Sequence, residues 1–344
     1  MRIRQIAVSI GSCVILAAMA FATGCTQSGA AGGDDKPNIA YVTNGIASFW
    51  VIAEKGVQAA AKDFDVNAET LMPPDGVGDQ KRMVQDLLTR GVDGIAISPI
   101  DPANQTDLLN EVAANTNLIT HDSDAPNSNR LCYIGMNNYD AGRMCGKLIK
   151  EALPDGGSIM LFVGRLEQLN AKLRRQGIID ELLDRDHNPD RYDEPGSEIR
   201  SDKYVVLNTL TDQFDFSKAK SLAQDAIARY PDLGCMVGLF AYNPPKIIEA
   251  VKEAGKQGKI QVIGFDEDAE TLQGIIDGHV HGTVVQDPYQ YGYQSVRILA
   301  ALARGDKSVL PENGFLNVPA QTITKENVVE FRKRLHELTG VATN

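Results

Sequence analysis

Three observations on this 344-residue chain predict an α/β fold built from two doubly wound, Rossmann-like lobes. From Asn38 onward, short runs rich in β-branched residues alternate with amphipathic segments of helical length. These runs are continuously apolar, which is typical of strands in parallel sheets that helices cover on both faces. There are about ten such units, more than one twisted sheet comfortably holds. Two lobes are therefore the more economical arrangement.

The predicted strands and helices follow one another along most of the chain. We expect strands at NIAYVT, VNAETLM, GIAISP, LITHDS, CYIG, SIMLFV, YVVLNTL, CMVGLF, QVIGF and HGTVVQ. The clearest helices are EKGVQAAAKDF, QKRMVQDLLTRG and KIIEAVKEAGKQG, and the last two carry the glycine that commonly ends a helix. Residues 185–203 are charged, contain Pro and Gly and lack periodicity, so we expect a surface loop there.

Composition and charge narrow the classes of function. Hydrophobic residues make up 43% of the chain, enough to fill cores of this size, and the formal net charge is -11. Proteins that bind nucleic acid concentrate Lys and Arg, and this sequence has no basic stripe with interleaved aromatic residues. The acidic residues are scattered, which is typical of a soluble protein. We therefore expect no nucleic-acid partner.

The first residues resemble a secretory signal rather than part of the fold. Arg2 and Arg4 precede an apolar run over 6–22, and small residues gather towards the end of that run. The Ala-Thr-Gly-Cys sequence that ends at Cys25 resembles the cleavage box of bacterial lipoproteins. We therefore expect a signal peptide over 1–24 and a lipid on Cys25.

The segment 25–37 is expected to be a flexible tether, because it lacks apolar periodicity. Together these features predict an exported lipoprotein of the periplasm and cell envelope, held at a membrane by its lipid. Ordinary cleavage nearby is an alternative, since Ala22 stands where the box prefers leucine. An uncleaved transmembrane anchor fits less well, because the apolar run is short for a span and contains glycine. The choice between inner and outer membrane stays open.

Three cysteines lie beyond the signal region: Cys132, Cys145 and Cys235. None forms a CxxC pair, and no Cys/His grouping has the spacing of a zinc site. Cys132 falls in a strand-like run and Cys145 in a helix-like one, which favours buried thiols; a Cys132–Cys145 disulfide, compatible with export, is the alternative. His279 and His281 form an HxH pair without an evident third ligand, so we expect no metal.

Polar residues follow five of the predicted strands at their carboxyl ends. They are Ser98 after GIAI, Asp122 after LITH, Asn243 after CMVGLFAY, Asp266 after QVIGF and Gln286 after HGTVV. In open parallel sheets, ligands bind beyond the carboxyl ends of the strands. Each residue alone also has a simpler interpretation as a helix cap, above all Asn243, which two prolines follow. As a set, they predict a polar binding site.

Seven further features carry a family resemblance. They are the aromatic pair Phe49-Trp50 before the first helix, GVDGIAISPIDP, the aspartate of THDSD, IGMNNYDAG, NAKLRRQG, VIGFDEDAE and VVQDPYQYG. Together they resemble periplasmic sugar-binding proteins of the ribose- and xylose-binding type, the substrate-capturing components of ABC importers. The resemblance covers 38–323 and implies the periplasmic binding protein type I fold, with two lobes joined by a hinge of three crossovers.

The resemblance also implies where the lobes begin and end. The first lobe is expected over 38–137 plus 287–315, and the second over 138–286 plus 316–340. The chain should cross between them near 136–139, near 264–268 or 284–288, and within 315–323. The helix at about 288–304 should pack on the first lobe despite its late position in the chain.

A set of ligand-binding residues follows from the same resemblance. By position, they are the aromatic walls Phe49, Trp50 and Phe214; the carboxylates Asp122 and Asp266; the amides Asn243 and Gln286; Lys172 as the basic group, with Arg174 the next choice; and Ser98 and Asn137. Aromatic planes cover the apolar faces of a sugar ring. Each carboxylate can accept two vicinal hydroxyls in charge-assisted bonds, and an amide can donate and accept at once.

This chain departs from the ribose-binding pattern at three points. Ser123 and Asp124 stand where ribose binders have an arginine, Ala47 or Ser48 replaces an asparagine, and Lys172 replaces an arginine. NAKLRRQG is closer to the xylose-binding branch, whereas DSD resembles relatives that bind a furanose-derived autoinducer. The identity of the sugar is therefore left open.

The expected function is that of a monomeric receptor that captures a pentose-like or related monosaccharide without a cofactor and delivers it to the membrane subunits of an ABC permease. A receptor that signals to a membrane sensor would use the same pocket and stays open. A repressor of this fold would need a DNA-binding segment where this chain has a signal. An enzyme is disfavoured, because no GxSxG, P-loop or HExxH motif occurs and Asp122 with Asp124 is a commonplace pair at a strand end.

Overall fold

The computed structural model describes residues 36–340, which lie within one compact unit. The predicted signal peptide, most of the tether and Cys25 fall outside these residues. Among the described residues, no helix is both long enough and apolar enough to cross a membrane. Two sheets organise this part of the chain, and each sheet with its helices is called a lobe below.

The first lobe is built on a six-stranded sheet in the order β12-β5-β4-β3-β1-β2, in which every pair is parallel. Its elements are β1 (Asn38–Val42), α1 (Ser48–Asp63), β2 (Asn67–Leu71), α2 (Val77–Arg90), β3 (Gly94–Ile97), α3 (Thr106–Asn115), β4 (Asn117–His121), β5 (Tyr133–Gly135), α9 (Pro288–Ala303) and β12 (Phe315–Asn317).

The second lobe is built on a seven-stranded sheet in the order β13-β11-β10-β9-β6-β8-β7, antiparallel only at its two edges. Its elements are α4 (Asn138–Ala152), β6 (Gly157–Val163), α5 (Leu169–Leu182), β7 (Ile199–Arg200), β8 (Tyr204–Thr211), α6 (Phe216–Arg229), β9 (Leu233–Gly238), α7 (Asn243–Glu253), β10 (Gln261–Phe265), α8 (Ala269–Asp277), β11 (Gly282–Val285), β13 (Gln321–Thr324) and α10 (Val328–Thr339). The short edge strand β7 lies inside the segment expected to be only a loop.

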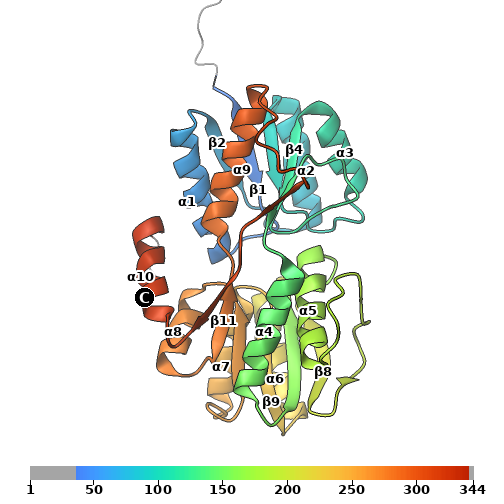
Figure 1. Cartoon of the computed structure of the whole chain (residues 1–344), viewed down its shortest axis with the longest axis vertical. Coiled ribbons are helices and arrows are strands. Elements are labelled where there is room, and N and C mark those ends of the chain that lie inside the picture. The colour runs from blue at the N-terminus through green and yellow to red at the C-terminus, as the bar shows by residue number, and fades with distance from the viewer. Residues whose placement is uncertain (1–35, 341–344) are drawn as a thin grey trace, which may run out of the picture. The chain divides into compact units, whose positions relative to one another are not determined.

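The chain crosses between the sheets three times, which confirms the predicted hinge. It crosses between β5 and α4, between β11 and α9, and between β12 and β13 (Figure 1). Helix α9 packs against α1, β3 and β4 of the first lobe, as the sequence predicts. Because β12 runs to Asn317 in the first sheet, the third crossing begins two residues later than the expected limit at 315.

The strands bury both faces of each sheet, as their continuous apolar sequences predict. In β1, Ile39 and Tyr41 pack on the side of α1 and α9, whereas Ala40 and Val42 pack on the side of α2 and α3. In the second lobe, alternate residues of β6 likewise enter two separate cores. Parallel strands covered by helices are held in this way on both sides.

The three cysteines are buried free thiols, so the alternative of a Cys132–Cys145 disulfide is wrong. Cys132 lies in the core of the first lobe, whereas Cys145 and Cys235 lie in the core of the second. Burial raises the pKa of the Cys132 thiol to about 11. These side chains therefore serve as small apolar core residues.

In each lobe, two helices pack closely because one of them carries a glycine at the point of contact. A Cβ on Gly56 of α1 would lie 1.9 Å from the carbonyl oxygen of Tyr289, near the start of α9. In the second lobe, a Cβ on Gly177 of α5 would lie 2.1 Å from the carbonyl oxygen of Tyr139 in α4. Only glycine allows such a close backbone approach, and the contact fixes how α1 and α5 are rotated about their axes.

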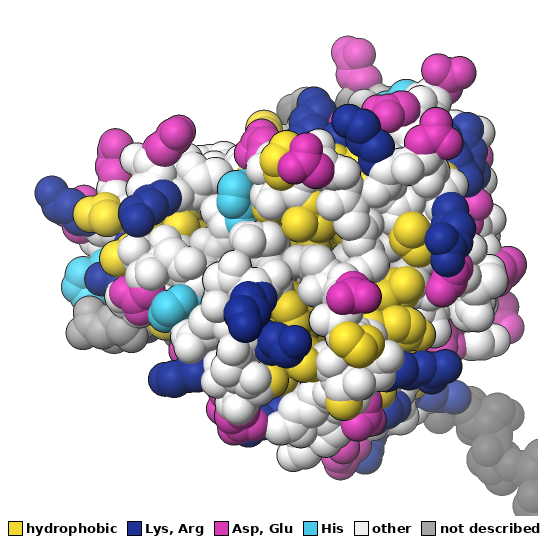
Figure 2. Space-filling view, turned by 90° about the horizontal axis from the view of Figure 1, so that it is seen from below, with side chains coloured by type: hydrophobic (Ala, Val, Ile, Leu, Met, Phe, Trp, Pro, Cys, Tyr) yellow, Lys and Arg dark blue, Asp and Glu magenta, His cyan; other side chains and the backbone are white. Residues whose placement is uncertain are grey.

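The surface carries charges of both signs. Figure 2 shows basic and acidic side chains interspersed over the face seen from below. The segment 185–203 is held by an internal ion pair between Arg185 and Asp193 at 2.6 Å, and the Nε2 of Gln176 on α5 donates a hydrogen bond to Asp193 at 2.6 Å. A segment that the sequence marks only as charged is thus anchored to α5.

Candidate functional site

A small cavity lies between the two lobes, at the carboxyl ends of the parallel strands. It is lined by Asn44, Ala47, Phe49, Trp50 and Asp122 from the first lobe, and by Asn170, Arg174, Phe214, Phe240, Ala241, Tyr242, Asp266 and Gln286 from the second. The cavity has a volume of about 30 Å³, which holds only a few water molecules. The lobes are therefore closed on one another.

Two aspartates occupy matching positions in the two lobes. Asp122 follows β4 with φ 57°, and Asp266 follows β10 with φ 68°. The backbone N–H of Asp122 donates to the carbonyl of Ile134, and that of Asp266 donates to the carbonyl of Val284, each on the next strand of its sheet. A left-handed backbone is uncommon outside glycine and is best tolerated by Asp and Asn. Each lobe thus uses the same turn to present a carboxylate to the cleft.

Asp122 is held by three side chains. Its Oδ2 accepts hydrogen bonds from Ser98 at 3.0 Å, from Asn170 at 3.1 Å and from Asn44 at 3.3 Å. The Asn170 bond joins the lobes, because Asn170 lies on α5. Burial raises the pKa of Asp122, although the charge of Arg174 and the hydrogen bonds from Ser98 and Asn170 oppose that rise.

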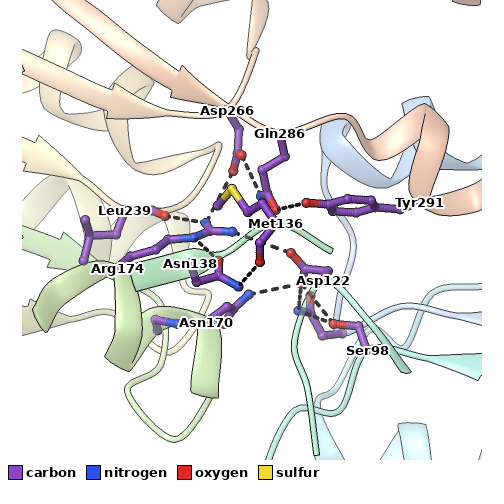
Figure 3. A network of polar contacts seen from close by, with 12 residues as sticks. Ser98, Asp122, Met136, Asn138, Asn170, Arg174, Leu239, Asp266, Gln286 and Tyr291 are labelled. Atoms are coloured by element: carbon purple, nitrogen blue, oxygen red, sulfur yellow. Dashed lines mark hydrogen bonds and ion pairs between the residues drawn. The ribbon is translucent and has the colours of Figure 1, made fainter. Parts of the chain in front are cut away.

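Asp266 is held from the second lobe and the hinge. Its Oδ1 accepts a hydrogen bond from the Nε2 of Gln286 at 2.8 Å, and the Oε1 of Gln286 accepts one from the Tyr291 hydroxyl at 3.0 Å. Tyr291 lies on α9 of the first lobe, so this chain of bonds crosses the hinge (Figure 3). Burial raises the pKa of Asp266 to about 6, against the opposing charge of Arg174.

Arg174 lies between the two carboxylates. Its Nε donates to Asn138 at 3.0 Å and its Nη1 donates to the carbonyl of Leu239 at 3.0 Å (Figure 3). Its nitrogens come only within 3.7 Å of Asp122 and 3.9 Å of Asp266, too far for hydrogen bonds. Nη2 has no hydrogen-bond partner among residues 36–340. The buried guanidinium is thus incompletely satisfied.

One wall of the cavity is aromatic and comes from the first turn of α1. Phe49 and Trp50 meet edge to face, with ring centroids 4.7 Å apart. Behind Trp50, the rings of Tyr41 and His121 stack with centroids 3.9 Å apart, and His121 meets Trp50 edge to face. Burial lowers the pKa of His121 to about 3, so this ring is neutral. The wall is therefore backed by a rigid aromatic stack.

The opposite wall comes from the second lobe. Phe214 follows β8 with φ 66° and lies 5.6 Å from Phe240 and 5.4 Å from Tyr242, between ring centroids. The backbone N–H of Phe214 donates to Asp212, which also accepts hydrogen bonds from Tyr242 and Asn243. Asp212 therefore supports this aromatic wall from behind.

The structure brings most of the predicted residues together and leaves others apart. Those that line the cavity are Phe49, Trp50, Asp122, Arg174, Phe214, Asp266 and Gln286. Ser98 is buried behind Asp122, and Asn243 is buried behind the aromatic wall, so each touches the lining rather than the cavity.

Two predicted residues, Lys172 and Asn137, lie outside the cavity. Lys172 lines a separate hollow at the cleft edge, with Nζ 5.8 Å from the ring centre of Tyr192, and does not line the cavity. Asn137 is exposed and caps α4, accepting a hydrogen bond from the N–H of Asp140. Its neighbour Asn138 is buried and binds Arg174 instead.

For two residues, Asp266 and Asn243, the structure distinguishes a role beside the cleft from a role as a helix cap. Helix α8 is capped by Asp268, whose side chain accepts from the N–H of Glu270, so Asp266 is not the cap. The alternative interpretation of Asn243 as a helix cap is wrong, because Asn243 is the first residue of α7 and its Oδ1 accepts from the N–H of Phe240. Both residues instead support the cleft.

Several lining residues were not predicted as site residues: Asn44, Asn170, Phe240, Ala241 and Tyr242. Signals existed for two of them. Asn44 follows the first strand as the other polar residues follow theirs, and Asn170 is the first residue of the NAKLRRQG motif. Among residues 36–340, no group of three or more His, Cys, Asp or Glu side chains is placed to hold a metal ion.

Asp124, the second member of the commonplace strand-end pair, is engaged elsewhere. It forms an ion pair with Arg130, and its Oδ1 also accepts a hydrogen bond from Thr120 at 2.6 Å. It lines the hollow at the cleft edge rather than the cavity. Asp122 faces the cavity without it.

Comparisons with known proteins agree with this architecture. The chain is 24% identical over 264 residues to the ribose import binding protein of Salmonella typhimurium, covering 75% of this chain and 82% of that one. A solute-binding protein of an ABC transporter from Burkholderia graminis, solved in complex with D-arabinose, is 25% identical, with a TM-score of 0.76 over 85% of this chain and 96% of that one.

A third similarity is in fold alone. A chain from a XylFII–LytSN complex is 20% identical, with a TM-score of 0.73 over 85% of this chain and 98% of that one. The model of the periplasmic binding protein domain family matches residues 39–307. With two lobes, three crossings and a closed interlobe cavity, this chain belongs to the periplasmic binding protein domain family.

Proposed function

We propose that this protein captures a monosaccharide, pentose-like or closely related, between its lobes and delivers it to the membrane subunits of an ABC import permease. In this proposal it acts as a monomer in the periplasm, anchored by a lipid on Cys25. The family and the names of its relatives support a binding protein rather than an enzyme.

The observation that carries the proposal is the combination of aromatic walls and paired carboxylates in one cavity. Phe49 and Trp50 face the cavity from one lobe, and Phe214 faces it from the other. A sugar ring presents apolar C–H faces and a rim of hydroxyls, so aromatic planes and buried acceptors suit it together. Asp122 and Asp266 supply the acceptors.

The closed cavity also constrains how a ligand enters. A space that holds only a few waters is smaller than a pentose, so the lobes must separate before a sugar binds. The three hinge segments permit such a rotation without disturbing either sheet. Closure over the sugar would then exclude water from its hydroxyls.

A second candidate is a receptor whose ligand-bound form is read by a membrane sensor. The similarity to the XylFII chain, solved in a complex with LytSN, favours it, although that similarity concerns the fold alone. The same pocket would serve both functions. Uptake of the cognate sugar, measured as growth after deletion of the gene for this protein, distinguishes import from signalling. Loss of uptake is expected only from the import function.

The test is titration calorimetry against a panel of pentoses, hexoses, polyols and furanose signals. Asp266→Asn keeps the shape of the side chain and tolerates the left-handed backbone, whereas alanine would add strain at φ 68°. Loss of a hydrogen bond to a charged group costs roughly 1.5–3 kcal/mol, so affinity should fall by about tenfold to over a hundredfold.

Trp50→Phe shortens the aromatic wall while leaving its buried neighbours in place, and should weaken binding with little loss of stability. Asp277→Asn, an exposed change on α8, is the matched control. If Asp266→Asn and Trp50→Phe both bind the sugar like the parent while folded, the ligand site is elsewhere. Mass spectrometry of the exported protein, with Cys25→Ser as comparison, tests the lipid anchor.

A further inference from the structure

We infer that the cleft has an outer subsite for an anionic oxygen group, a carboxylate or a phosphate, carried by the bound sugar, with Arg165 as its recognition residue. This inference rests on the proposed function. It adds a chemical class of ligand, an acidic or phosphorylated sugar, that the inner cavity alone does not indicate.

A second hollow adjoins the inner cavity and is larger. Its volume is about 200 Å³. It is lined by Asn44, Gly45, Ile46, Pro73, Pro74, Gly76, Arg165, Phe214 and Phe216. Asn44 and Phe214 line both spaces. A substituent on a sugar held in the inner cavity therefore has a place to extend, past the edge of Phe214.

Phe214 separates the two spaces. A Cβ on Gly45, in the first lobe, would lie 3.7 Å from the Phe214 ring, so the ring reaches across the cleft to the opposite backbone. Gln213 and Phe214 both have left-handed backbone, with φ 62° and 66°. Such positions are uncommon for non-glycine residues and often lie at ligand-contacting segments. The Phe214 side chain thus lies at the boundary that the two spaces share.

Arg165 is the only charged residue among those that line this hollow. Its guanidinium carbon lies 4.6 Å from the centre of the Phe214 ring, and its one hydrogen bond to another described residue is a long one of 3.4 Å to the carbonyl of Gln213. Within residues 36–340 no carboxylate forms an ion pair with it. Burial lowers the pKa of Arg165, and the opposing effects of Tyr242, Glu167 and Asp212 do not offset it.

The nearby acids do not neutralise this cation. Asp212 accepts hydrogen bonds from Tyr242, Asn243 and the N–H of Phe214, and Glu167 is exposed. A half-buried guanidinium beside an open hollow, stacked on a wall of the sugar site, lacks the planar anion that its donors match. An anionic substituent on the ligand would supply it.

Calorimetry on neutral and anionic members of two sugar pairs tests the inference: D-xylose with D-glucuronate, and D-ribose with D-ribose 5-phosphate. The first pair probes a carboxylate and the second a phosphate. We expect the parent to bind the anionic member of at least one pair tenfold or more tightly than the neutral member, with a preference that falls as salt rises.

Arg165→Met keeps an apolar contact on Phe214 and removes the charge. It should abolish the anionic preference and leave affinity for the neutral sugar within about threefold, whereas Arg165→Lys should retain part of the preference. Arg229→Met is the matched control, because Arg229 also stacks on a ring, that of Tyr230, at 5.5 Å on a remote helix.

The outcomes separate the two claims. If a neutral sugar binds as tightly as its anionic partner in both pairs, or if Arg165→Met keeps the preference, the outer subsite is refuted and the proposed function stands. If neither neutral nor anionic sugars bind the parent, both are refuted.

Discussion

Glu267 gives the sharpest test of the electrostatics beside the cleft. It follows Asp266 directly and is buried, and neither of its carboxyl oxygens has a hydrogen-bond partner among the described residues. Burial, with the nearby charges of Asp266, Asp287 and Asp268, raises its pKa well above the ordinary value for glutamate. The folded protein must therefore keep a proton on Glu267 or bury an uncompensated charge.

The sign of the pH dependence follows from the raised pKa. Below the ordinary glutamate pKa of 4.5, the side chain is protonated in both the folded and unfolded states and lowers stability least. As pH rises towards the folded-state pKa, the unfolded chain loses the proton first. Each pH unit in that window then costs the folded state about 1.4 kcal/mol.

Glu267→Gln removes this dependence while keeping the shape of the side chain. An unpaired buried polar group costs about 1–3 kcal/mol, and a charged one costs more. We expect the variant to exceed the parent in unfolding free energy by about 1–3 kcal/mol near pH 8, a difference that shrinks towards zero near pH 4.5. Chemical unfolding across this pH range measures it.

The control is Glu270→Gln, an exposed change in the first turn of α8, for which we expect no such trend. A difference between Glu267→Gln and the parent that stays constant from pH 5 to 8 would refute the reasoning. It would mean that Glu267 has the same protonation in the folded and unfolded protein.

Three further outcomes are expected. Sugar affinity should fall as pH drops below about 6, where the Asp266 carboxyl gains its proton, and calorimetry from pH 5 to 7.5 would contradict this by showing a flat profile. Lys172→Ala should bind sugar within about twofold of the parent, since Lys172 lies outside the cavity; a loss of tenfold or more would restore its predicted role. Gly177→Ala should lower unfolding free energy by roughly 1–3 kcal/mol or more in thermal or chemical denaturation, because its Cβ would lie 2.1 Å from the Tyr139 carbonyl oxygen.

The sequence could predict the fold and the strand-end residues because both depend on local pattern. Continuously apolar runs identify parallel strands, and the polar residue after each run must then lie at the same edge of a sheet. Asp122 and Asp266 were found in this way, and both face the cleft. The same rule applied to the first strand would have added Asn44.

Helix rotation could not be predicted in this way. Lys172 and Arg174 are two residues apart on α5, so they point about 200° apart around the axis. Gly177 contacts the backbone of α4 closely, and Arg174, three residues earlier, lies on that same face. The tertiary contact therefore turns Arg174 towards the cleft and Lys172 away from it. An alignment of motifs carries no information on this rotation.

Single-residue shifts at helix starts had a similar cause. Asn137 caps α4 and is exposed, whereas Asn138, the next residue, is buried on Arg174. Which of two adjacent asparagines begins a helix depends on how the strand before it ends, and helix limits read from sequence alone are uncertain by one or two residues. The motif therefore indicates the two adjacent asparagines, but it does not indicate which of them is buried on Arg174.

The closed cavity itself argues that closure depends on a ligand. Arg174 is buried between two carboxylates that it does not reach, and its Nη2 donor lacks a partner in the described part of the chain. An orphaned buried donor costs about 1–3 kcal/mol, and two partly neutralised carboxylates add to that cost. Opening would return these groups to water, whereas two sugar hydroxyls could each donate to one of the carboxylates of Asp122 and Asp266 while accepting from Arg174. The empty protein should therefore favour separated lobes, and the bound sugar should shift the population towards closure because its hydroxyls complete a polar network that the protein leaves unfinished.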